Sequence, residues 1–293
     1  MHVFITGGTG LIGSTVVAEL LAGGHTVLGL ARSEASAALL DRAGAEVLRG
    51  GLTDLDTLRA GAAQADGVIH LAFGNDFSSP EALAANIAEE GAALATLGEA
   101  LVGSGRPLVT VSGTPAVPGR ASTEADPLPT DGPVAGRSRS VAAILDLSSQ
   151  DVRSASVRLP RTVHNNGSGG FAGLLTNIAR QSGVSGFAGD GTQRWPAVHA
   201  LDAAVLFRLV LEHAPAGTAW HAVADEGDAV RDIATVIGRR LNLPVESVAP
   251  ETYGPLGSVF AMDQPASSAL TREELGWEPT HPSLLDDLEN IQP

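Results

Sequence analysis

The chain has 293 residues with an apolar fraction of 44%, which is enough for one large α/β domain or two lobes. Its formal net charge of −15, with the basic residues scattered, disfavours nucleic acid and anionic membranes as partners. Because no run of 18 apolar residues occurs, no basic leader precedes the first strand and cysteine is absent, we expect a cytoplasmic protein without membrane spans, disulfides or cysteine–metal sites.

The first thirteen residues carry a glycine pattern that predicts a ligand site. An apolar stretch at residues 3–5 leads into Gly7, Gly10 and Gly13, and an apolar helical pattern follows. In a dinucleotide-binding turn the first glycine permits the tight turn, the second admits a pyrophosphate and the third lets the helix pack on the sheet. A glycine-rich turn without a ligand is the alternative. The predicted cofactor contacts are Gly7, Thr9, Gly10, Leu11, Ile12 and Gly13.

The second predicted strand, residues 25–30, ends without the carboxylate that holds the ribose hydroxyls of NAD. Arg32 and Ser33 stand there instead. A guanidinium beside a hydroxyl suits a 2′-phosphate, because arginine offers phosphate oxygens a planar fork of donors. The pattern therefore favours NADP(H), with Arg32 and Ser33 as ligands. Glu34 argues against this because it would repel a phosphate, and a solvated surface arginine is the alternative.

Strands and helices then alternate along the first half of the chain. Strands are predicted at residues 46–48, 67–72, 107–112 and 154–159, and helices at 55–65, 80–101 and 138–147. This alternation predicts an α/β fold with a Rossmann-type doubly wound parallel sheet over residues 1–160. Ligands of such sheets bind at the carboxyl ends of the strands.

The second half, residues 161–293, is predicted to be a smaller mixed α/β lobe that binds substrate. Its segment at about 190–215 is expected to return to the large sheet. Polar residues 164–170 and the proline-rich residues 115–133 are predicted loops. Helices are predicted at 171–181, 200–212, 229–241 and 267–275, and a strand at 218–223.

The order of motifs resembles the short-chain dehydrogenase/reductase superfamily in its extended or atypical, epimerase/dehydratase-like branch. The resemblance rests on residues 6–13, 54–55, 70–72, 86, 112–114, 158–160, 198–202 and 275–277. It implies a homodimer through the helices near 80–101 and 136–148. Asp54 could also be the N-cap of the helix that follows it. The cofactor contacts that the resemblance implies are Asp54, Leu55, Leu71, Ala72, Phe73, Pro160, Arg161 and Val163.

The chain departs from this superfamily at the catalytic pair. Most members carry Tyr-x-x-x-Lys on the helix after the fifth strand, but here Ala135 and Arg139 take those positions, and the chain has one tyrosine and no lysine. Thr114 matches the active-site Ser/Thr of the family, or is a turn hydroxyl. His164 could donate a proton, or could be a loop histidine in water. The predicted catalytic residues are Ser112, Thr114, Arg139 and His164.

The other histidines and acids are interpreted as structural. His199 and Asp202 are predicted to pair, with the histidine buried and oriented by an aspartate at a helix N-terminus. His281 belongs to no recognisable group, and Asp286 and Asp287 are predicted to be a solvated helix face. No His/Asp/Glu grouping has metal-ligand spacing, so no metal site is predicted.

These patterns predict an NADPH-dependent oxidoreductase that reduces a C=O or C=N bond of a small, mostly apolar substrate. An iminium is already protonated, so its reduction needs positioning and charge stabilisation more than a strong acid. A non-catalytic NADP(H)-binding sensor is one alternative. Sugar-nucleotide epimerase or dehydratase activity is another, although it depends on the Tyr–Lys pair even more, and no basic cluster is visible for a substrate diphosphate.

Overall fold

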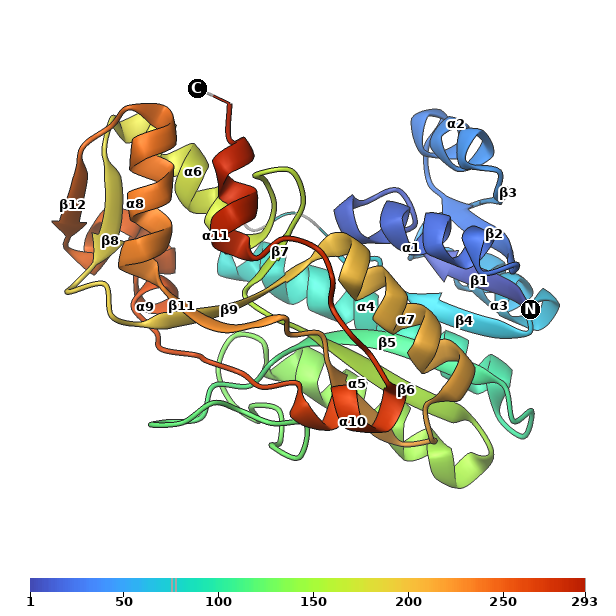
Figure 1. The fold of residues 1–293 in the computed structure, drawn as a ribbon. Coiled ribbons are helices and arrows are strands. Elements are labelled where there is room, and N and C mark those ends of the chain that lie inside the picture. The colour runs from blue at the N-terminus through green and yellow to red at the C-terminus, as the bar shows by residue number, and fades with distance from the viewer. Residues whose placement is uncertain (75, 77, 293) are drawn as a thin grey trace. The chain divides into compact units, whose positions relative to one another are not determined.

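The computed structural model describes residues 1–74, 76 and 78–292, and these fall into two compact units. Unit 1 comprises residues 1–112, 127–158 and 204–220, and unit 2 comprises residues 113–126, 159–203 and 221–293. The elements of both units are labelled in Figure 1.

Unit 1 is built on a seven-stranded sheet with the order β10-β6-β5-β4-β1-β2-β3. β1 pairs in parallel with β2 on one side and with β4 on the other, so the order reverses at β1. This reversal is the mark of a doubly wound sheet, and the predicted Rossmann-type α/β fold is confirmed. The strands are β1 (His2–Thr6), β2 (Thr26–Ala31), β3 (Glu46–Arg49), β4 (Gly67–His70), β5 (Pro107–Gly113), β6 (Arg153–Leu159) and β10 (Thr218–His221).

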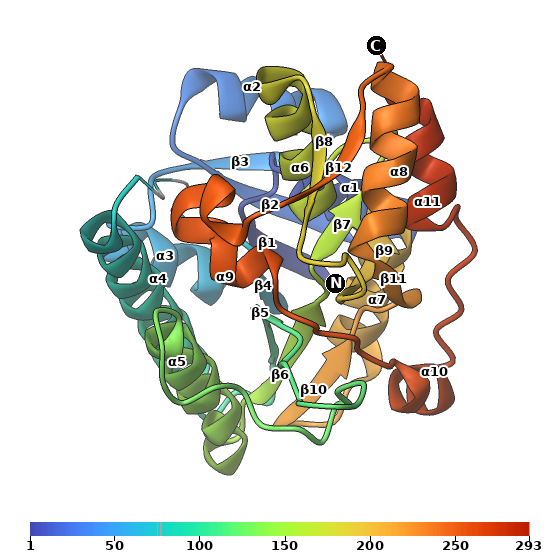
Figure 2. The ribbon, with the colours of Figure 1, turned by 90° about the vertical axis from the view of Figure 1, so that its left-hand side faces the viewer.

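Helices cover the sheet of unit 1. In Figure 2, α3, α4 and α5 lie together on one face. On α4, Ser79 caps the N-terminus by accepting from the Ala82 N–H, and the predicted bounds 80–101 are confirmed. The helix predicted at 138–147 begins earlier, at Ala135. The helices are α1 (Leu11–Ala22), α2 (Glu34–Ala43), α3 (Leu55–Gln64), α4 (Pro80–Leu101), α5 (Ala135–Asp146), η1 (Leu147–Gln150) and residues 204–213 of α7 (Ala200–His213).

Unit 2 contains two small sheets. A three-stranded sheet has the order β11-β9-β7, with β7 parallel and β11 antiparallel to β9. A parallel pair joins β8 and β12. The strands are β7 (Thr162–His164), β8 (Ser185–Ala188), β9 (Arg194–His199), β11 (Asp225–Ala229) and β12 (Val245–Val248). The helices are α6 (Gly170–Ser182), α8 (Val230–Leu241), η2 (Pro250–Leu256), α9 (Gly257–Phe260), α10 (Ala269–Leu275), α11 (Leu284–Asp287) and η3 (Leu288–Asn290).

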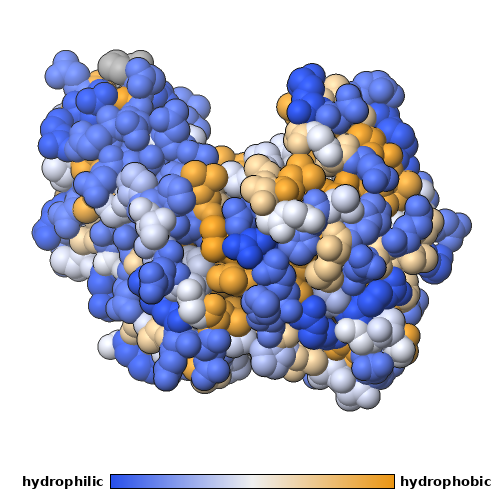
Figure 3. Space-filling view, turned by 45° about the vertical axis from the view of Figure 1, so that its right-hand side comes forward, coloured by the Kyte–Doolittle hydropathy of each residue, from blue (hydrophilic) through white to orange (hydrophobic). Residues whose placement is uncertain are grey.

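Each unit has its own core. Phe4, Leu58 and Leu97 are fully buried in unit 1, and Trp195 and Ile233 are fully buried in unit 2. On the face drawn in Figure 3, hydrophilic residues predominate and hydrophobic side chains form smaller groups between them. The two units therefore bury separate sets of apolar side chains.

Among the described residues, no helix combines the length and the apolarity that crossing a membrane would require.

Candidate active site

Gly7, Gly10 and Gly13 form the turn between β1 and α1. Gly7 has a φ of 75°, in the left-handed region, and a Cβ there would lie 2.7 Å from the main-chain N of Ala72. A Cβ at Gly13 would collide with the carbonyl O of Gly7. A Cβ at Gly10 would meet nothing closer than that carbonyl O, at 3.6 Å. The backbone therefore requires glycine at positions 7 and 13, whereas Gly10 leaves room that a ligand can use.

Helix α1 begins at this turn with Gly10 as its N-cap and with no side-chain cap. Its first N–H groups carry the positive end of the helix dipole and are not used by a capping side chain. Leu11 is 41% exposed, while Thr9 and Ile12 are half-buried. The turn has the geometry that accommodates a diphosphate, and the contacts predicted for these three side chains remain predictions.

The corner at the end of β2 holds two arginines. Arg32 is exposed and has no partner among the described residues. Arg49, at the end of β3, pairs with Glu34 at 2.8 Å and donates to the Ser33 carbonyl O at 3.0 Å. The Ser33 hydroxyl accepts from the Ser36 N–H and so caps α2. The carboxylate of Glu34 therefore has its own counter-ion, and the corner keeps a net positive charge.

Residues after β3 and β4 that the resemblance assigns to the cofactor also have structural roles. Asp54 caps α3 by accepting from the Thr57 N–H at 3.3 Å, which confirms its predicted capping role. The Ala72 N–H donates to the Thr6 hydroxyl at 3.3 Å. His70 is buried beside Thr6, and burial together with the charge of Arg137 lowers its pKa to about 4. His70 is therefore neutral at pH 7.

Arg137, two residues from both Ala135 and Arg139, forms an ion pair between α5 and α4. Arg137 makes two hydrogen bonds of 2.7 Å to the buried carboxylate of Glu90 and lies 4.3 Å from the ring centre of Phe73. Burial raises the pKa of Glu90, and the hydrogen bond and charge of Arg137 oppose this rise. Ala135 is buried at the start of the helix and Arg139 is exposed.

Two hydroxyls of the predicted catalytic set lie on β5 and just after it. The Ser112 hydroxyl is buried and lies 3.0 Å from the Ser156 hydroxyl of β6. Thr114, in unit 2, is also buried, and its hydroxyl has no hydrogen-bond partner in the described part of the chain. Its carbonyl O accepts from the Gln264 side chain. Of these two hydroxyls, that of Thr114 is therefore the one available to form a hydrogen bond with a ligand.

His164 is buried at the end of β7, so the alternative of a loop histidine in water is wrong. Its Nδ1 lies 2.9 Å from Oδ2 of Asp287 on α11, which also accepts from the Gly167 N–H at 3.0 Å. Burial would raise the pKa of Asp287, but the hydrogen bonds from His164 and Gly167 outweigh it and hold the pKa below its usual value. The prediction of a solvated face is wrong for Asp287 and holds for the exposed Asp286.

His199 ends β9 opposite His164 in the register, and the two rings meet edge to face with centres 5.3 Å apart. The predicted pair with Asp202 is wrong, because His199 Nδ1 accepts from the Leu201 N–H at 3.2 Å. Asp202 instead lies 2.7 Å from Nδ1 of His281. The His281 ring stacks on His199 at 4.9 Å. We call His164, His199, His281, Asp202 and Asp287 the histidine cluster.

The hydrogen bonds assign the protons of two of these rings. His164 donates from Nδ1 to the Asp287 carboxylate, so in the neutral ring Nε2 is an acceptor, and this buried atom has no partner among residues 1–74, 76 and 78–292. His199 accepts at Nδ1, so its neutral ring carries the proton on Nε2. Burial, followed by the nearby His164, lowers the pKa of His199. A ring acceptor and a ring donor therefore lie together, as acid–base chemistry requires.

Ligand atoms of His164, His199 and Asp287 all lie within 4.8 Å of one another. Sequence spacing could not show this grouping because the three residues are far apart in the chain. Hydrogen bonds already use Nδ1 of both rings and one oxygen of Asp287. The Nδ1–carboxylate bond of His164 leaves its Nε2 free, as in metal-bound histidines, but the Nδ1 lone pair of His199 is used by the Leu201 N–H, and the absence of a metal remains a prediction.

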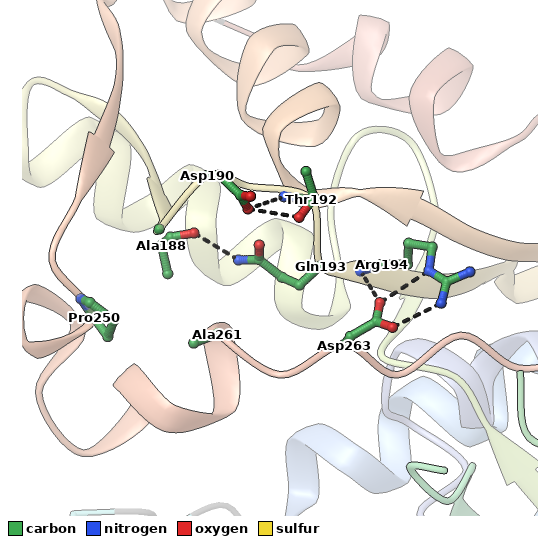
Figure 4. Close-up of a pocket in the computed structure, with 9 residues that line it drawn as sticks. Ala188, Asp190, Thr192, Gln193, Arg194, Pro250, Ala261 and Asp263 are labelled. Carbon is green, nitrogen blue, oxygen red and sulfur yellow. Dashed lines mark hydrogen bonds and ion pairs between the residues drawn. The ribbon is translucent and has the colours of Figure 1, made fainter. Parts of the chain in front are cut away.

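A pocket of about 450 Å³ opens elsewhere in unit 2 (Figure 4). Its charged groups are paired within the pocket: Asp190 accepts from the Thr192 hydroxyl at 2.7 Å, and Arg194 pairs with Asp263 at 2.8 Å. None of the predicted site residues lines it. Its lining residues are Ala188, Gly189, Asp190, Thr192, Gln193, Arg194, Pro250, Ala261 and Asp263.

Known proteins are similar to this chain in sequence and in fold. A model of the NAD dependent epimerase/dehydratase family matches residues 3–223. An uncharacterized protein of Schizosaccharomyces pombe is 46% identical over 297 residues, which cover 98% of this chain and 98% of that protein.

Two solved structures show the likeness of fold. The UDP-glucose 4-epimerase of Thermotoga maritima with UDP-glucose has a TM-score of 0.81 and 19% identity, and the match covers 99% of this chain and 97% of the epimerase. The dTDP-glucose 4,6-dehydratase DesIV of Streptomyces venezuelae with NAD bound has a TM-score of 0.75 and 22% identity, with 99% and 95% covered. At these identities the likeness concerns the fold alone.

Proposed function

The chain belongs to the NAD dependent epimerase/dehydratase family, and from this premise we propose that it is an NADPH-dependent oxidoreductase that reduces a C=O or C=N bond of a small organic substrate. Its relative in Schizosaccharomyces pombe is uncharacterized, so the proposal rests on this chain's own residues. The two structural neighbours with sugar-nucleotide activities are only 19% and 22% identical to this chain. No described residue of this chain independently favours such an activity.

The observation that carries the proposal is the open space at Gly10 in front of the uncapped N-terminus of α1. A Cβ at that position would fill the space that a pyrophosphate needs. The fold neighbour DesIV has NAD bound, which supports a nicotinamide coenzyme. When bound, such a coenzyme would supply the hydride for the reduction.

The arginines of the β2–β3 corner support the choice of NADPH. Arg32 is exposed and without a partner in the described ranges, so it can donate to a 2′-phosphate without breaking an existing bond. The repulsion expected from Glu34 is reduced because Arg49 neutralises that carboxylate. The Ser33 hydroxyl is occupied as a helix cap, so its predicted role is secondary to that of Arg32.

His164 is the proposed proton donor. A substrate oxygen or nitrogen that reaches Nε2 would displace no existing hydrogen bond, because that atom has no partner among the described residues. Asp287 holds Nδ1 at 2.9 Å and so fixes the orientation of the ring, with Nε2 left to exchange a proton with the substrate. The unpartnered hydroxyl of Thr114 could donate a second hydrogen bond.

Titration calorimetry with NADPH and NADH, followed by turnover assays, tests this proposal. The substrates would be a panel of ketones and cyclic imines, followed at the absorbance of the reduced nicotinamide. We expect NADPH to bind more tightly than NADH, and we expect oxidation of NADPH with at least one carbonyl or imine class. Failure of both coenzymes to bind would overturn the proposal.

A non-catalytic NADP(H) sensor is the second candidate. The single tyrosine, Tyr253, lies in unit 2, where burial raises its pKa to about 12, and Arg137 on α5 is held by Glu90. Ala135 and Arg139 stand at the positions of the usual catalytic pair, and neither supplies the proton of the missing tyrosine. Tight NADPH binding without turnover on any substrate of the panel would favour the sensor.

A further inference from the structure

Arg161, between β6 and β7, is a buried arginine without a carboxylate partner among the described residues. The residue is 9% exposed, and burial lowers its pKa to about 10. Buried charges in proteins are normally paired, because removing an ion from water costs several kcal/mol. An unpaired guanidinium of this kind therefore requires an explanation.

Neutral groups hold the Arg161 side chain in place. Nε donates to Gln264 Oε1 at 2.6 Å, and Nη1 donates to the Val259 carbonyl O at 3.0 Å. The guanidinium lies 5.2 Å from the ring centre of Phe171 and 5.9 Å from that of Trp195. These contacts orient the charge without neutralising it. Both N–H groups of Nη2 and one of Nη1 are left with no acceptor in the described part of the chain.

Two half-buried arginines of this protein are compensated. Arg106 donates to three carbonyl oxygens near helix ends, those of Ala62, Ala65 and Ala100. Carbonyls at helix C-termini carry a partial negative charge. Arg137 has the carboxylate of Glu90. Arg161 differs from both, because among the described residues it has no acid and only one such carbonyl, that of Val259.

Two further donors near Arg161 are unused. Gln264 links Arg161 to the carbonyl O of Thr114, whose hydroxyl is buried without a partner in the described ranges. The indole Nε1 of Trp195 is also buried without a partner there. Trp195 packs edge to face against Phe171 and Phe260. A positive charge, two spare donors and aromatic rings therefore occur together in unit 2.

We propose that Arg161 binds the carboxylate of a small ligand whose apolar body packs against the half-buried Phe171. The planar fork of Nη1 and Nη2 matches a carboxylate with two parallel hydrogen bonds, and one arginine balances one negative charge. That this ligand is also the substrate, an oxo or imino carboxylic acid, rests on the proposed function. The carboxylate site at Arg161 does not depend on the proposed function. Carboxylate binding would also replace the cofactor role that sequence resemblance implies for Arg161.

The first test uses the full chain without coenzyme, so that it is independent of the reductase proposal. Benzoate and hexanoate are compared with the neutral benzamide and with inorganic phosphate, by melting temperature and calorimetry. We expect the two carboxylates to bind and to raise the melting temperature, and benzamide and phosphate to bind at least about tenfold more weakly. Equal binding of benzoate and benzamide, or no binding of either carboxylate, would overturn the proposal.

The second test uses Arg161→Met, Arg161→Lys and the control Arg106→Met. Because Met removes an unpaired buried charge, Arg161→Met should keep or raise the melting temperature while weakening carboxylate binding at least about tenfold. Arg161→Lys keeps the charge but loses the fork, and should give an intermediate affinity. Arg106→Met should lower the melting temperature and leave the carboxylate affinity unchanged.

Two results would overturn the assignment. In the first, Arg161→Met is destabilised as much as Arg106→Met, and Arg161→Lys binds benzoate as tightly as the wild type does. Arg161 would then have a structural role only. The other is an Arg161→Met protein that loses NADPH affinity and retains benzoate affinity, because Arg161 would then serve the coenzyme. Unchanged NADPH binding with lost benzoate binding supports the proposal, whatever the outcome of the turnover assays.

Discussion

The glycine turn of unit 1 and the histidine cluster of unit 2 are built in opposite ways. The turn uses consecutive residues, and its geometry depends on backbone angles and on the absence of Cβ atoms at Gly7 and Gly13. The cluster brings together side chains from the ends of β7 and β9, from α11, and from residues 202 and 281. A site of the first kind is sensitive to steric changes, whereas one of the second kind is sensitive to loss of a hydrogen-bond partner.

Gly13→Ala should give the largest effect. The added Cβ would collide with the Gly7 carbonyl, so the turn must shift, and we expect coenzyme affinity to fall by about 100-fold or more. Gly10→Ala is the matched control, because its Cβ meets nothing closer than 3.6 Å. It should keep the thermal stability of the wild type and lose coenzyme affinity. Equal coenzyme affinities in both variants and the wild type would remove the turn from the site.

Asp287→Ala tests the cluster through stability. The His164 and Gly167 N–H groups would lose their acceptor, and the free energy of unfolding should fall by about 1–3 kcal/mol in urea titrations at pH 7. The folded pKa of Asp287 is lowered, so its ionised form stabilises the protein above the unfolded pKa. That contribution disappears as pH falls through the folded pKa. The difference between wild type and variant should therefore shrink in acid, and a constant difference would contradict the assignment.

His164→Gln tests the proposed proton donor. We expect turnover of a ketone to fall by about tenfold or more, because proton transfer by a positioned side chain contributes at least that much. Coenzyme affinity, measured by calorimetry, should stay unchanged. Thr114→Ala is the companion variant and should lose a similar factor. Full activity in both variants would leave the reductase without a named catalytic group.

Arg32→Asp tests coenzyme choice at the edge of the glycine turn. Loss of the guanidinium and addition of a carboxylate should shift the ratio of NADPH to NADH affinity by about tenfold or more towards NADH, or about 1.4 kcal/mol. Arg49→Met is a useful second variant because it frees Glu34 to repel a 2′-phosphate. An unchanged ratio in Arg32→Asp would remove the argument for NADP(H).

Zinc should produce the smallest effect. Because the Nδ1 lone pair of His199 is already used by the Leu201 N–H, a Zn²⁺ ion would have to displace this hydrogen bond, and we expect added Zn²⁺ to leave the melting temperature unchanged at stoichiometric concentration. Calorimetry would check this. Micromolar binding with release of protons, lost in His164→Gln, would show that the cluster is a metal site.

The predictions from sequence are confirmed where the structural requirements are local. The doubly wound sheet is predicted from alternating strand and helix patterns, the bounds of α4 are predicted as residues 80–101, and Asp54 is predicted as a possible helix N-cap. The predictions are wrong where the hydrogen-bond partners of a side chain come from distant segments of the chain. His199 and Asp202 are three residues apart, yet they do not pair. His199, at the end of β9, accepts from the Leu201 N–H at the start of α7, and Asp202 hydrogen-bonds to His281.

The sequence by itself therefore determined the coenzyme-type turn, because a positive φ, a missing Cβ and an uncapped helix start are properties of neighbouring residues. Only the tertiary structure decided that Asp287 orients His164 and that Arg161 has no carboxylate partner among the described residues. His164 and Asp287 are separated by 123 positions and meet only when α11 packs on the small sheet of unit 2. The environment of a buried charge is likewise set by packing, which no local pattern encodes.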